Sequence, residues 1–360
     1  MSYTLADKIK NLTPYDPITS HYRIRLDANE SFLPANDAIC ADLREWLVKL
    51  DFNRYPDPYA VRLCEAFGRY YGVHPDYVTA GNGSDELISI LIGSFLHKND
   101  RILTFSPDFS MYRFYSELME DRVEVLEKDA DMRIDLDQAA AVIRERQIRA
   151  VIFSNPCNPT SLGISADAVR RFVRSTDALV ILDEAYMDFW DQANESLLCE
   201  AAAYDNLVIL RTCSKAIGMA SVRLGFAVAG PVLTRAIRAA KSPYNVNSMT
   251  QAVGEVIFSH PDTLREALRL IKASRDELYA AICALAEKHP QLERVYPTVT
   301  NFVYLRTQDA KELDQMLRDR SIAIRRMGEH LRITAGTKEE NQALLQAFSE
   351  ILQQNGKGCD

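Results

Sequence analysis

Asn206-Leu-Val-Ile-Leu-Arg-Thr-Cys-Ser-Lys215 joins a short apolar run directly to a polar segment that ends in a lysine. Residues 206–210 have the length and the Val, Ile and Leu content of a strand that is buried on both faces. Ala150-Val-Ile-Phe-Ser154 and Ala178-Leu-Val-Ile-Leu-Asp183 have the same character, and helix-like segments such as 166–174 separate runs of this kind. The sequence therefore predicts an α/β fold in which helices cover both faces of a mostly parallel central sheet.

The chain is expected to divide into three parts. Residues 1–35 are proline-containing and predict an extended arm, whereas residues 36–245 hold the alternating helices and strands and predict a large domain. Residues 246–360 no longer show the regular alternation of helices and short apolar runs, and they include a long helical stretch at 261–288. They predict a smaller α+β domain that the arm completes. Other expected elements are a helix at 37–50 capped by Asn36 or Asp37, a helix at 85–95, strands at 101–105, 301–306 and 331–334, and a final helix opened by the capping-box spacing of Thr337-Lys-Glu-Glu340.

Composition excludes several classes of protein. The chain has 360 residues, of which 47% are hydrophobic, so it can bury a large core. Its net charge of -8 argues against a nucleic-acid-binding surface, and no apolar run is long enough to span a bilayer. The first residues lack a signal-peptide pattern, the seven cysteines form no CxxC pair, and the six histidines have no ligand spacing. We expect a soluble, cytoplasmic protein without a metal site, a membrane partner or a nucleic-acid partner.

Polar motifs begin where the apolar runs stop, so they follow the carboxyl ends of the predicted strands. In parallel sheets the functional groups gather at this edge. Lys215 follows one such run, between the hydroxyls of Thr212 and Ser214 and Arg223, which lies eight residues further on. An amine in this setting can bond an aldehyde while the hydroxyls and the guanidinium hold a phosphate dianion. The ordinary alternative is a surface lysine in a polar loop.

A second run ends at Asp183, and Tyr186 follows three residues later. A buried carboxylate needs a partner, because an unpaired one would be very costly or would take up a proton. The chain lacks the Gly-x-x-x-x-Gly-Lys-Ser/Thr sequence that would make Asp183 part of a nucleotide site. A pyridinium nitrogen would suit the carboxylate, since the pair would keep the ring an electron sink. A buried salt bridge is the other explanation.

Three further motifs have both a functional and a structural interpretation. Ala80-Gly-Asn-Gly-Ser-Asp-Glu-Leu87 could offer free N–H groups at a helix start to a phosphate, or it could be an ordinary helix capped by Ser84. Phe109, which follows Ser-Pro-Asp, could stack on a flat cofactor or pack in the core. Asn158, between two prolines, could present a rigid amide to the same edge or form a plain turn.

In this order, the motifs together resemble the fold-type I pyridoxal-phosphate aminotransferases, and most closely the histidinol-phosphate aminotransferase family. The resemblance extends over nearly the whole chain. It also includes Leu12-Thr-Pro-Tyr15, Leu26-Asp-Ala-Asn-Glu30, Arg54-Tyr-Pro-Asp-Pro58, Pro243-Tyr-Asn-Val-Asn247 and Leu331-Arg-Ile-Thr-Ala-Gly336.

This resemblance implies that pyridoxal 5′-phosphate is the cofactor. Lys215 would hold it through a Schiff base and move a proton between Cα and C4′, while Asp183 would pair with the ring nitrogen. Asn158 and Tyr186 would contact the phenolic oxygen, and Phe109 would stack on the ring. The cofactor phosphate would be surrounded by Gly83, Ser84, Asp85, Thr212, Ser214 and Arg223.

The resemblance also implies a homodimer, because Tyr55 would reach the cofactor phosphate of the neighbouring subunit. Arg332 would grip the anionic end of the substrates with the help of Arg325, since arginine suits both carboxylate and phosphate. Tyr15, from the partner chain, and Asn29 would complete the substrate contacts.

The implied activity is ping-pong transfer of an amino group from L-histidinol phosphate to 2-oxoglutarate. Aromatic aminotransferases and threonine-phosphate decarboxylases share the scaffold of the resembled family. Both activities therefore stay open as alternatives. A non-catalytic regulator is a third, although too few residues precede Asn29 for a helix-turn-helix. Ser161 and Ser221 stand where many members of the resembled family have glycine, and both replacements could reshape loops near the site.

Overall fold

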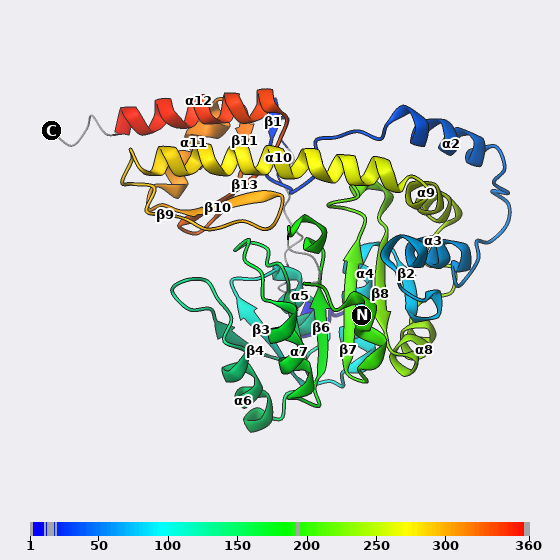
Figure 1. The fold of residues 1–360 in the computed structure, drawn as a ribbon. Coiled ribbons are helices and arrows are strands. Elements are labelled where there is room, and N and C mark those ends of the chain that lie inside the picture. Colours follow the sequence, from blue (N-terminus) through cyan, green and yellow to red (C-terminus); the bar gives the residue numbers. More distant parts are fainter. Residues whose placement is uncertain (1–2, 11, 13–17, 19, 192–194, 356–360) are drawn as a thin grey trace.

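A seven-stranded sheet forms the centre of the larger part of the molecule (Figure 1). In the computed structural model, each neighbouring pair of its strands is parallel except the two pairs that include β8. The mostly parallel sheet predicted from the apolar runs is therefore confirmed. The strand order is β2 (Val78–Gly81), β8 (Gly225–Ala229), β7 (Leu207–Thr212), β6 (Leu179–Asp183), β5 (Ala150–Ser154), β3 (Arg101–Ser106) and β4 (Arg122–Glu127). The structure describes residues 3–10, 12, 18, 20–191 and 195–355.

The central strands are apolar throughout because both faces of the sheet are buried. In β6, Val180 and Leu182 belong to one core and Ile181 to another. Helices cover both faces, which explains why these runs show no alternation between apolar and polar residues. The first core includes residues of α3 (Val61–Tyr71), α6 (Leu136–Arg146) and α7 (Ala166–Arg174), and the second includes residues of α4 (Gly83–Phe95), α5 (Ser110–Leu118) and α8 (Pro231–Ala240).

The smaller part is built on a four-stranded antiparallel sheet and a separate core. The sheet has the order β12 (Arg325–Met327), β13 (His330–Thr334), β10 (Phe302–Arg306) and β9 (Arg294–Val295). The N-terminal arm joins this part, because β1 (Ile24–Arg25) pairs in parallel with β11 (Ile322–Ala323). The core also contains residues of α11 (Ala310–Asp319) and α12 (Lys338–Asn355).

A 26-residue helix, α10 (Pro261–Ala286), spans the two parts (Figure 1). Leu264 near its start belongs to the core of the larger part, and Ile282 near its end belongs to that of the smaller part. Between them, the buried Arg275 donates to the carbonyl oxygens of Phe189 and Thr300, both at 3.2 Å. Helix α9 (Ser248–Phe258) also packs on the larger core. The domain boundary predicted at residue 246 stays a prediction. Because α9 and the start of α10 pack on the larger core, we propose that the division falls within α10.

Helix ends show where local sequence was sufficient. α2 (Asp37–Leu47) is capped by Asn36, whose Oδ1 accepts from the N–H of Ile39 at 2.9 Å. At α12, Thr337 N–H donates to Glu340 Oε2 (2.8 Å) and Glu340 N–H donates to Thr337 Oγ1 (3.2 Å), so the capping box is confirmed. Ser84 is no cap, because α4 begins one residue earlier and the Glu86 carboxylate accepts from Asn82 N–H.

Several elements were not predicted. β4 lies at the sheet edge and has a partly exposed, mixed sequence. β8 is rich in glycine and alanine, so its sequence differs from the Val, Ile and Leu runs of the predicted strands. The N-terminal arm contains the short helix α1 (Asp7–Lys10), in contrast to a wholly extended arm. Short 3₁₀ turns complete the connections, at η1 (Pro75–Tyr77), η2 (Met187–Phe189), η3 (Leu198–Ala203) and η4 (Ala220–Val222).

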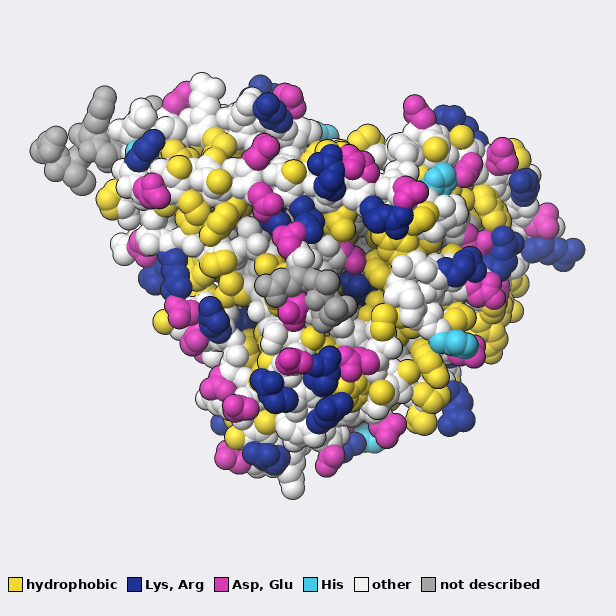
Figure 2. Space-filling model, in the orientation of Figure 1, with side chains coloured by type: hydrophobic (Ala, Val, Ile, Leu, Met, Phe, Trp, Pro, Cys, Tyr) yellow, Lys and Arg dark blue, Asp and Glu magenta, His cyan; other side chains and the backbone are white. Residues whose placement is uncertain are grey.

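The charge of the surface, the character of the helices and the grouping of possible metal ligands bear on whether a protein spans a membrane or binds a metal. Lys and Arg side chains are interspersed with Asp and Glu over the face in Figure 2. Within the described ranges, no helix combines the length and apolar character needed to cross a membrane. The same residues contain no cluster of three or more His, Cys, Asp or Glu that could hold a metal ion.

Candidate active site

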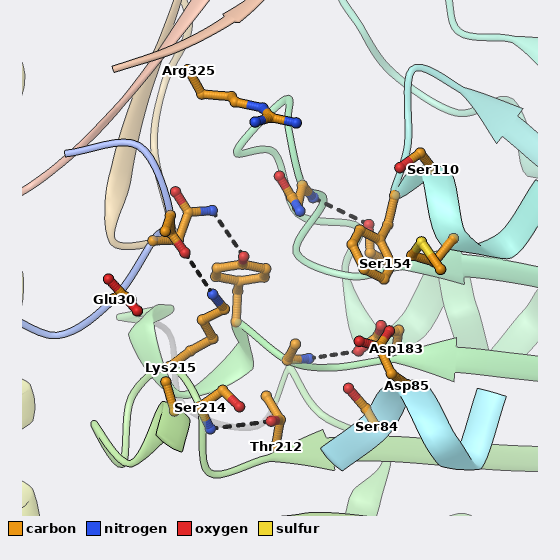
Figure 3. A pocket seen from close by; sticks show the side chains of 18 of the residues that line it. Glu30, Ser84, Asp85, Ser110, Ser154, Asp183, Thr212, Ser214, Lys215 and Arg325 are labelled. Atoms are coloured by element: carbon orange, nitrogen blue, oxygen red, sulfur yellow. Dashed lines mark hydrogen bonds between the residues drawn. The ribbon is translucent and has the colours of Figure 1, made fainter. Parts of the chain in front are cut away.

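A cavity of about 550 Å³ lies at the carboxyl ends of β3, β5, β6 and β7, beside the start of α4. The N-terminal arm and the strands β12 and β13 close it from the side of the smaller part (Figure 3). Most of the predicted site residues line it, namely Asn29, Ser84, Asp85, Phe109, Asn158, Asp183, Tyr186, Thr212, Ser214, Lys215, Arg223, Arg325 and Arg332.

Lys215 reaches across the cavity floor from the turn that follows β7. Its Nζ donates a 2.9 Å hydrogen bond to the carbonyl oxygen of Ala28 in the N-terminal arm (Figure 3). Burial lowers the pKa of Lys215 to about 8, and the positive charge of Arg332 acts in the same direction, while Glu30 opposes it. The amine therefore loses its proton far more easily than an ordinary lysine does, which is what a nucleophile and a proton carrier need.

Asp183 is the last residue of β6 and is held by two donors. The Tyr112 hydroxyl donates to its Oδ2 at 2.8 Å, and the Ala185 N–H donates to its Oδ1 at 3.0 Å. Burial raises the pKa of Asp183 to about 6 although these bonds oppose the change. The carboxylate is thus fixed in place and would gain from a cationic partner. Tyr112 received no role from the sequence, although it lies one helical turn after Phe109 on α5.

Two buried polar pairs link the arm and the smaller part to the large sheet. Asn29 Nδ2 donates to the Tyr186 hydroxyl at 2.8 Å, and burial raises the pKa of Tyr186 to about 12. Arg332 donates from Nη1 to Asn158 Oδ1 and from Nη2 to the carbonyl oxygen of Asp27, both at 2.6 Å. Residues far apart in the sequence therefore form one polar wall of the cavity.

The start of α4 forms a cradle for an anion. Gly83 has a φ of +79°, and a Cβ there would lie 2.8 Å from Arg223 Nη2. A Cβ on Gly225 would lie 2.4 Å from the N atom of Ser84, so this position also requires glycine. Arg223 Nη1 in turn lies 3.3 Å from Ser214 Oγ. The free N–H groups of the helix start, a hydroxyl and a guanidinium therefore converge, as anion sites require.

The remaining predicted residues have different positions. Arg325 enters the cavity from β12 (Figure 3), and its side chain makes no hydrogen bond or ion pair within the described part of the chain. Gly83 lies just behind the lining, against Arg223. Tyr55 is 82% exposed, stacks on Tyr244 with ring centroids 4.6 Å apart, and does not line the cavity of its own chain. Tyr15 lies outside the described residues.

Some lining residues were not singled out from the sequence. Asp108 follows β3 and has a buried side chain, which accepts from the Phe109 N–H at 2.8 Å and from the Ser154 hydroxyl. Ser154 Oγ accepts from the Asn158 N–H at 3.1 Å. Glu30 on the arm also lines the cavity near Lys215 (Figure 3). The only signal for Asp108 and Ser154 was their position at or just after a strand end, whereas Glu30 belongs to the Leu26–Glu30 motif of the resemblance but received no role.

The two serines that replace the glycines of the resembled family differ in their settings. Ser161 has a φ of +68°, a conformation that favours glycine, and it is fully buried. Its hydroxyl lies 2.6 Å from Thr298 Oγ1 and 2.8 Å from Thr300 Oγ1, so it ties the turn after β5 to the segment before β10. Ser221 is exposed in η4 and has no left-handed backbone.

We expect Ser161→Ala to lower the stability of the protein by about 1–3 kcal/mol, because buried hydroxyl partners lose a hydrogen bond. Thermal unfolding of the apoprotein measures this. Ser161→Gly is the matched control, since it removes the same hydroxyl but also relieves the left-handed strain, and it should lose less. An alanine variant as stable as the parent would contradict the proposed tie.

Comparisons with known proteins agree with this geometry. The family model Aminotransferase class I and II matches residues 23–348. The histidinol-phosphate aminotransferase of Clostridium kluyveri is 35% identical over 349 residues, covering 96% of this chain and 97% of the relative. That of Clostridium novyi is 38% identical over 338 residues, covering 92% and 93%.

A solved structure shows the fold independently. The histidinol-phosphate aminotransferase of Sinorhizobium meliloti, in complex with pyridoxal-5'-phosphate, superposes with a TM-score of 0.89 at 22% identity and covers 99% of each chain. At that identity the likeness establishes the fold, which is the predicted fold-type I α/β architecture. The extent of the family match and the identity to the curated relatives together establish membership. The chain belongs to the class I and II aminotransferases and, within them, to the histidinol-phosphate aminotransferase family.

Proposed function

We propose that the chain is an L-histidinol-phosphate:2-oxoglutarate aminotransferase that uses pyridoxal 5′-phosphate in a ping-pong reaction. The observation that carries this proposal is the joint lining of one cavity by the buried Lys215 and Asp183, the anion cradle at Arg223, and Arg325 with Arg332. The names of relatives that are 35–38% identical over almost the whole chain support the choice of donor.

The donor set of the cavity fits pyridoxal phosphate. Asp183 offers a buried carboxylate for a ring nitrogen, and the Tyr186 hydroxyl lies in the same cavity for a phenolic oxygen. The missing Cβ of Gly83 keeps Arg223 close to the helix start, where a phosphate would be received. When bound, this cofactor supplies an electron sink that stabilises negative charge on the α carbon of the substrate.

The protein's own groups would divide the remaining work. Lys215 would attach the cofactor aldehyde, and its amine, with a pKa near 8, would then take and return the proton at the substrate α carbon. Asp183 would hold a proton on the ring nitrogen by staying ionised, and Tyr112 would keep its carboxylate in position. Closure of the cavity by the arm would exclude water from these steps.

The two cavity arginines suggest how two different substrates are accepted. Arg332 is clamped by Asn158 and the carbonyl oxygen of Asp27, so it would offer a fixed guanidinium to either anion. Arg325 has no partner within the described residues and can follow the anion that is present. Planar guanidinium groups bind carboxylate and phosphate alike. We therefore assign the shared anion site to this pair.

We expect Arg325→Gln to lower kcat/KM for histidinol phosphate by about 10- to 100-fold, which corresponds to one charge-assisted hydrogen bond. The effect on L-phenylalanine, which has no phosphate, should be smaller. Steady-state kinetics with both donors measure the difference. Arg326→Gln is the matched control, because Arg326 is the adjacent, exposed arginine and carries the same charge outside the cavity. Equal losses in the two variants would contradict a role for Arg325 in substrate binding.

The half-reaction tests the proposed donor directly. The purified enzyme loaded with pyridoxal phosphate is mixed separately with L-histidinol phosphate and with L-phenylalanine, and the visible absorption of the bound cofactor is followed. We expect histidinol phosphate to bleach the band faster and 2-oxoglutarate to restore it. Faster bleaching by phenylalanine would make the protein an aromatic aminotransferase. Turnover of a phosphorylated amino acid with release of CO₂ and no use of 2-oxoglutarate would indicate a decarboxylase.

We also propose that the working unit is a homodimer. Large exposed apolar side chains occur close together in the sequence at Leu47, Val48, Phe52 and Tyr55, and Tyr55 stacks on the half-exposed Tyr244. Exposed apolar side chains that gather in one place usually mark an interface. Light scattering coupled to gel filtration should give twice the chain mass. A monomer with full activity would overturn the dimer and the role proposed for Tyr55.

A cytoplasmic location belongs to the same proposal. The cysteines in the described part of the chain are all free thiols. Free thiols of this number are typical of a reducing compartment. Fractionation of the source cells with an activity assay would test this location, and recovery of the activity outside the cytoplasm would contradict it.

A further inference from the structure

Lys128, Cys157 and Asp108 form a buried cluster directly behind the cavity wall. The side chains of Lys128 and Asp108 are each 1% exposed, and Cys157 is 4% exposed. Lys128 Nζ lies 2.7 Å from Cys157 Sγ and 3.9 Å from Asp108 Oδ2. Asp108 itself lines the cavity, and Cys157 immediately precedes the lining residue Asn158. None of the steps proposed above uses the amine or the thiol.

The distance between nitrogen and sulfur is too short for an ordinary contact. Hydrogen bonds from N–H to oxygen span about 2.7–3.2 Å, and sulfur is a larger atom than oxygen. Thiols in the described part of the chain lie further from carbonyl oxygens: Cys157 itself is 3.8 Å from that of Pro107, Cys40 and Cys64 have 3.7 Å contacts, and Cys199 has a 3.4 Å contact. A separation of 2.7 Å is the one that a single oxygen atom spans when it is bonded to both nitrogen and sulfur.

We propose that Lys128 and Cys157 form an oxidation-dependent covalent cross-link, Nζ–O–Sγ, with dioxygen as the oxidant. The O–O bond breaks, and one oxygen atom becomes bonded to both Nζ and Sγ. The other oxygen leaves as water with two of the three hydrogens shared by the amine and the thiol. Nitrogen and sulfur each lose two electrons, and these four electrons reduce the two oxygen atoms. A thiol reductant that supplies four electrons and four protons would reverse the link, because both the N–O and the O–S bonds break and the products are the amine, the thiol and one water.

The cross-link would affect the cavity through Asp108, which lines it. Burial raises the pKa of Asp108, and the neighbouring ammonium of Lys128 opposes this most strongly. A bridged nitrogen no longer carries the full positive charge, so the buried carboxylate loses its counter-ion. Asp108 holds the Phe109 N–H and the Ser154 hydroxyl, and Ser154 in turn holds Asn158. Oxidation should therefore lower turnover several-fold. The turnover measurement rests on the proposed aminotransferase activity, whereas detection of the cross-link itself does not depend on that activity.

Mass spectrometry tests the bond itself. The loaded enzyme is compared after exposure to air and after anaerobic incubation with dithiothreitol. We expect the aerobic sample to gain the mass of one oxygen atom less two hydrogen atoms. Trypsin should fail to cleave after Lys128, and the peptide that contains Lys128 should appear joined to that which contains Cys157. Cys213, which is equally buried, serves as the internal control and should stay unmodified.

Each other outcome is decisive. A loss of two hydrogens without added oxygen would indicate a direct S–N bond, and an added oxygen without hydrogen loss would indicate a sulfenic acid. Either result, or separate unmodified peptides after prolonged exposure to air, overturns the proposal. Cys157→Ala should abolish the cross-link and the oxygen sensitivity of turnover, whereas Cys213→Ala should keep both. If Cys157→Ala fails to fold, the oxidised and reduced forms of the parent enzyme still decide the question.

Discussion

Replacement of Lys215 by alanine should reduce turnover to the background. Loss of a positioned acid–base group alone costs about 10²–10⁴-fold in rate, and the variant also loses the amine that would attach the cofactor. The structure gives the reason, because Lys215 is the only lysine that lines the described cavity and burial lowers its pKa to about 8. Steady-state kinetics with histidinol phosphate and 2-oxoglutarate measure the loss, and the visible spectrum of the loaded protein reports the attachment.

Two controls separate the proposed tasks of Lys215. Lys215→Arg keeps the positive charge but removes a titratable amine, so it should be as inactive as the alanine variant. A small primary amine added to Lys215→Ala should restore part of the proton transfer. Retention of more than a few per cent of the parent activity in either variant, with no added amine, would exclude Lys215 as the proton carrier.

Asp183→Asn should lower kcat by about 10²–10³-fold, the usual cost of removing one preorganised charge from a reacting group. The neutral amide would no longer keep a ring nitrogen protonated, although it can still contact Tyr112 and Ala185. The loss should therefore appear in kcat more than in the affinity for substrate. Asp188→Asn is a suitable control, because Asp188 lies outside the described cavity and pairs with Arg211. An Asp183→Asn variant with the parent kcat would contradict the assignment.

The same substitution should stabilise the apoprotein. Burial raises the pKa of Asp183 from 3.8 to about 6, so the folded state binds this proton more tightly than the unfolded state does. The stability contributed by this group is therefore highest at low pH and falls as pH rises from 3.8 to about 6. Above that window the charge costs up to about 3 kcal/mol. Asp183→Asn should be more stable than the parent at about pH 8, and the difference should vanish at about pH 4. A less stable variant at the higher pH would show that its hydrogen bonds outweigh the burial of charge.

The fold was predictable because its strongest signals are local. Short apolar runs identify strands that are covered on both faces, and β5 and β7 consist entirely of buried residues. The parallel arrangement places the carboxyl ends of β5, β6 and β7 at one edge, so Asp183 and Lys215 could be assigned to a common site from their positions in the sequence. The roles given to them stay predictions until the variants are measured.

Contacts between segments that are distant in the sequence could not be predicted from local sequence patterns. Asn29 bonds Tyr186 across 157 positions, and Arg332 bonds Asn158 across 174. No periodicity or motif spacing encodes such pairs, because they depend on how the arm and the smaller part pack against the large sheet. The family resemblance suggested that these residues share a site, but it did not give their partners.

By itself, the sequence determined the α/β class, the mostly parallel sheet, the capping box of the final helix and the family. Each of these depends on interactions within a strand, a helix turn or a short motif, which are readable over a few residues. Only the tertiary structure decided that Tyr112 holds Asp183, that Ser161 ties the two parts together, and that Lys128 lies against Cys157. These contacts follow from the packing of side chains whose separation in space is unrelated to their separation along the chain.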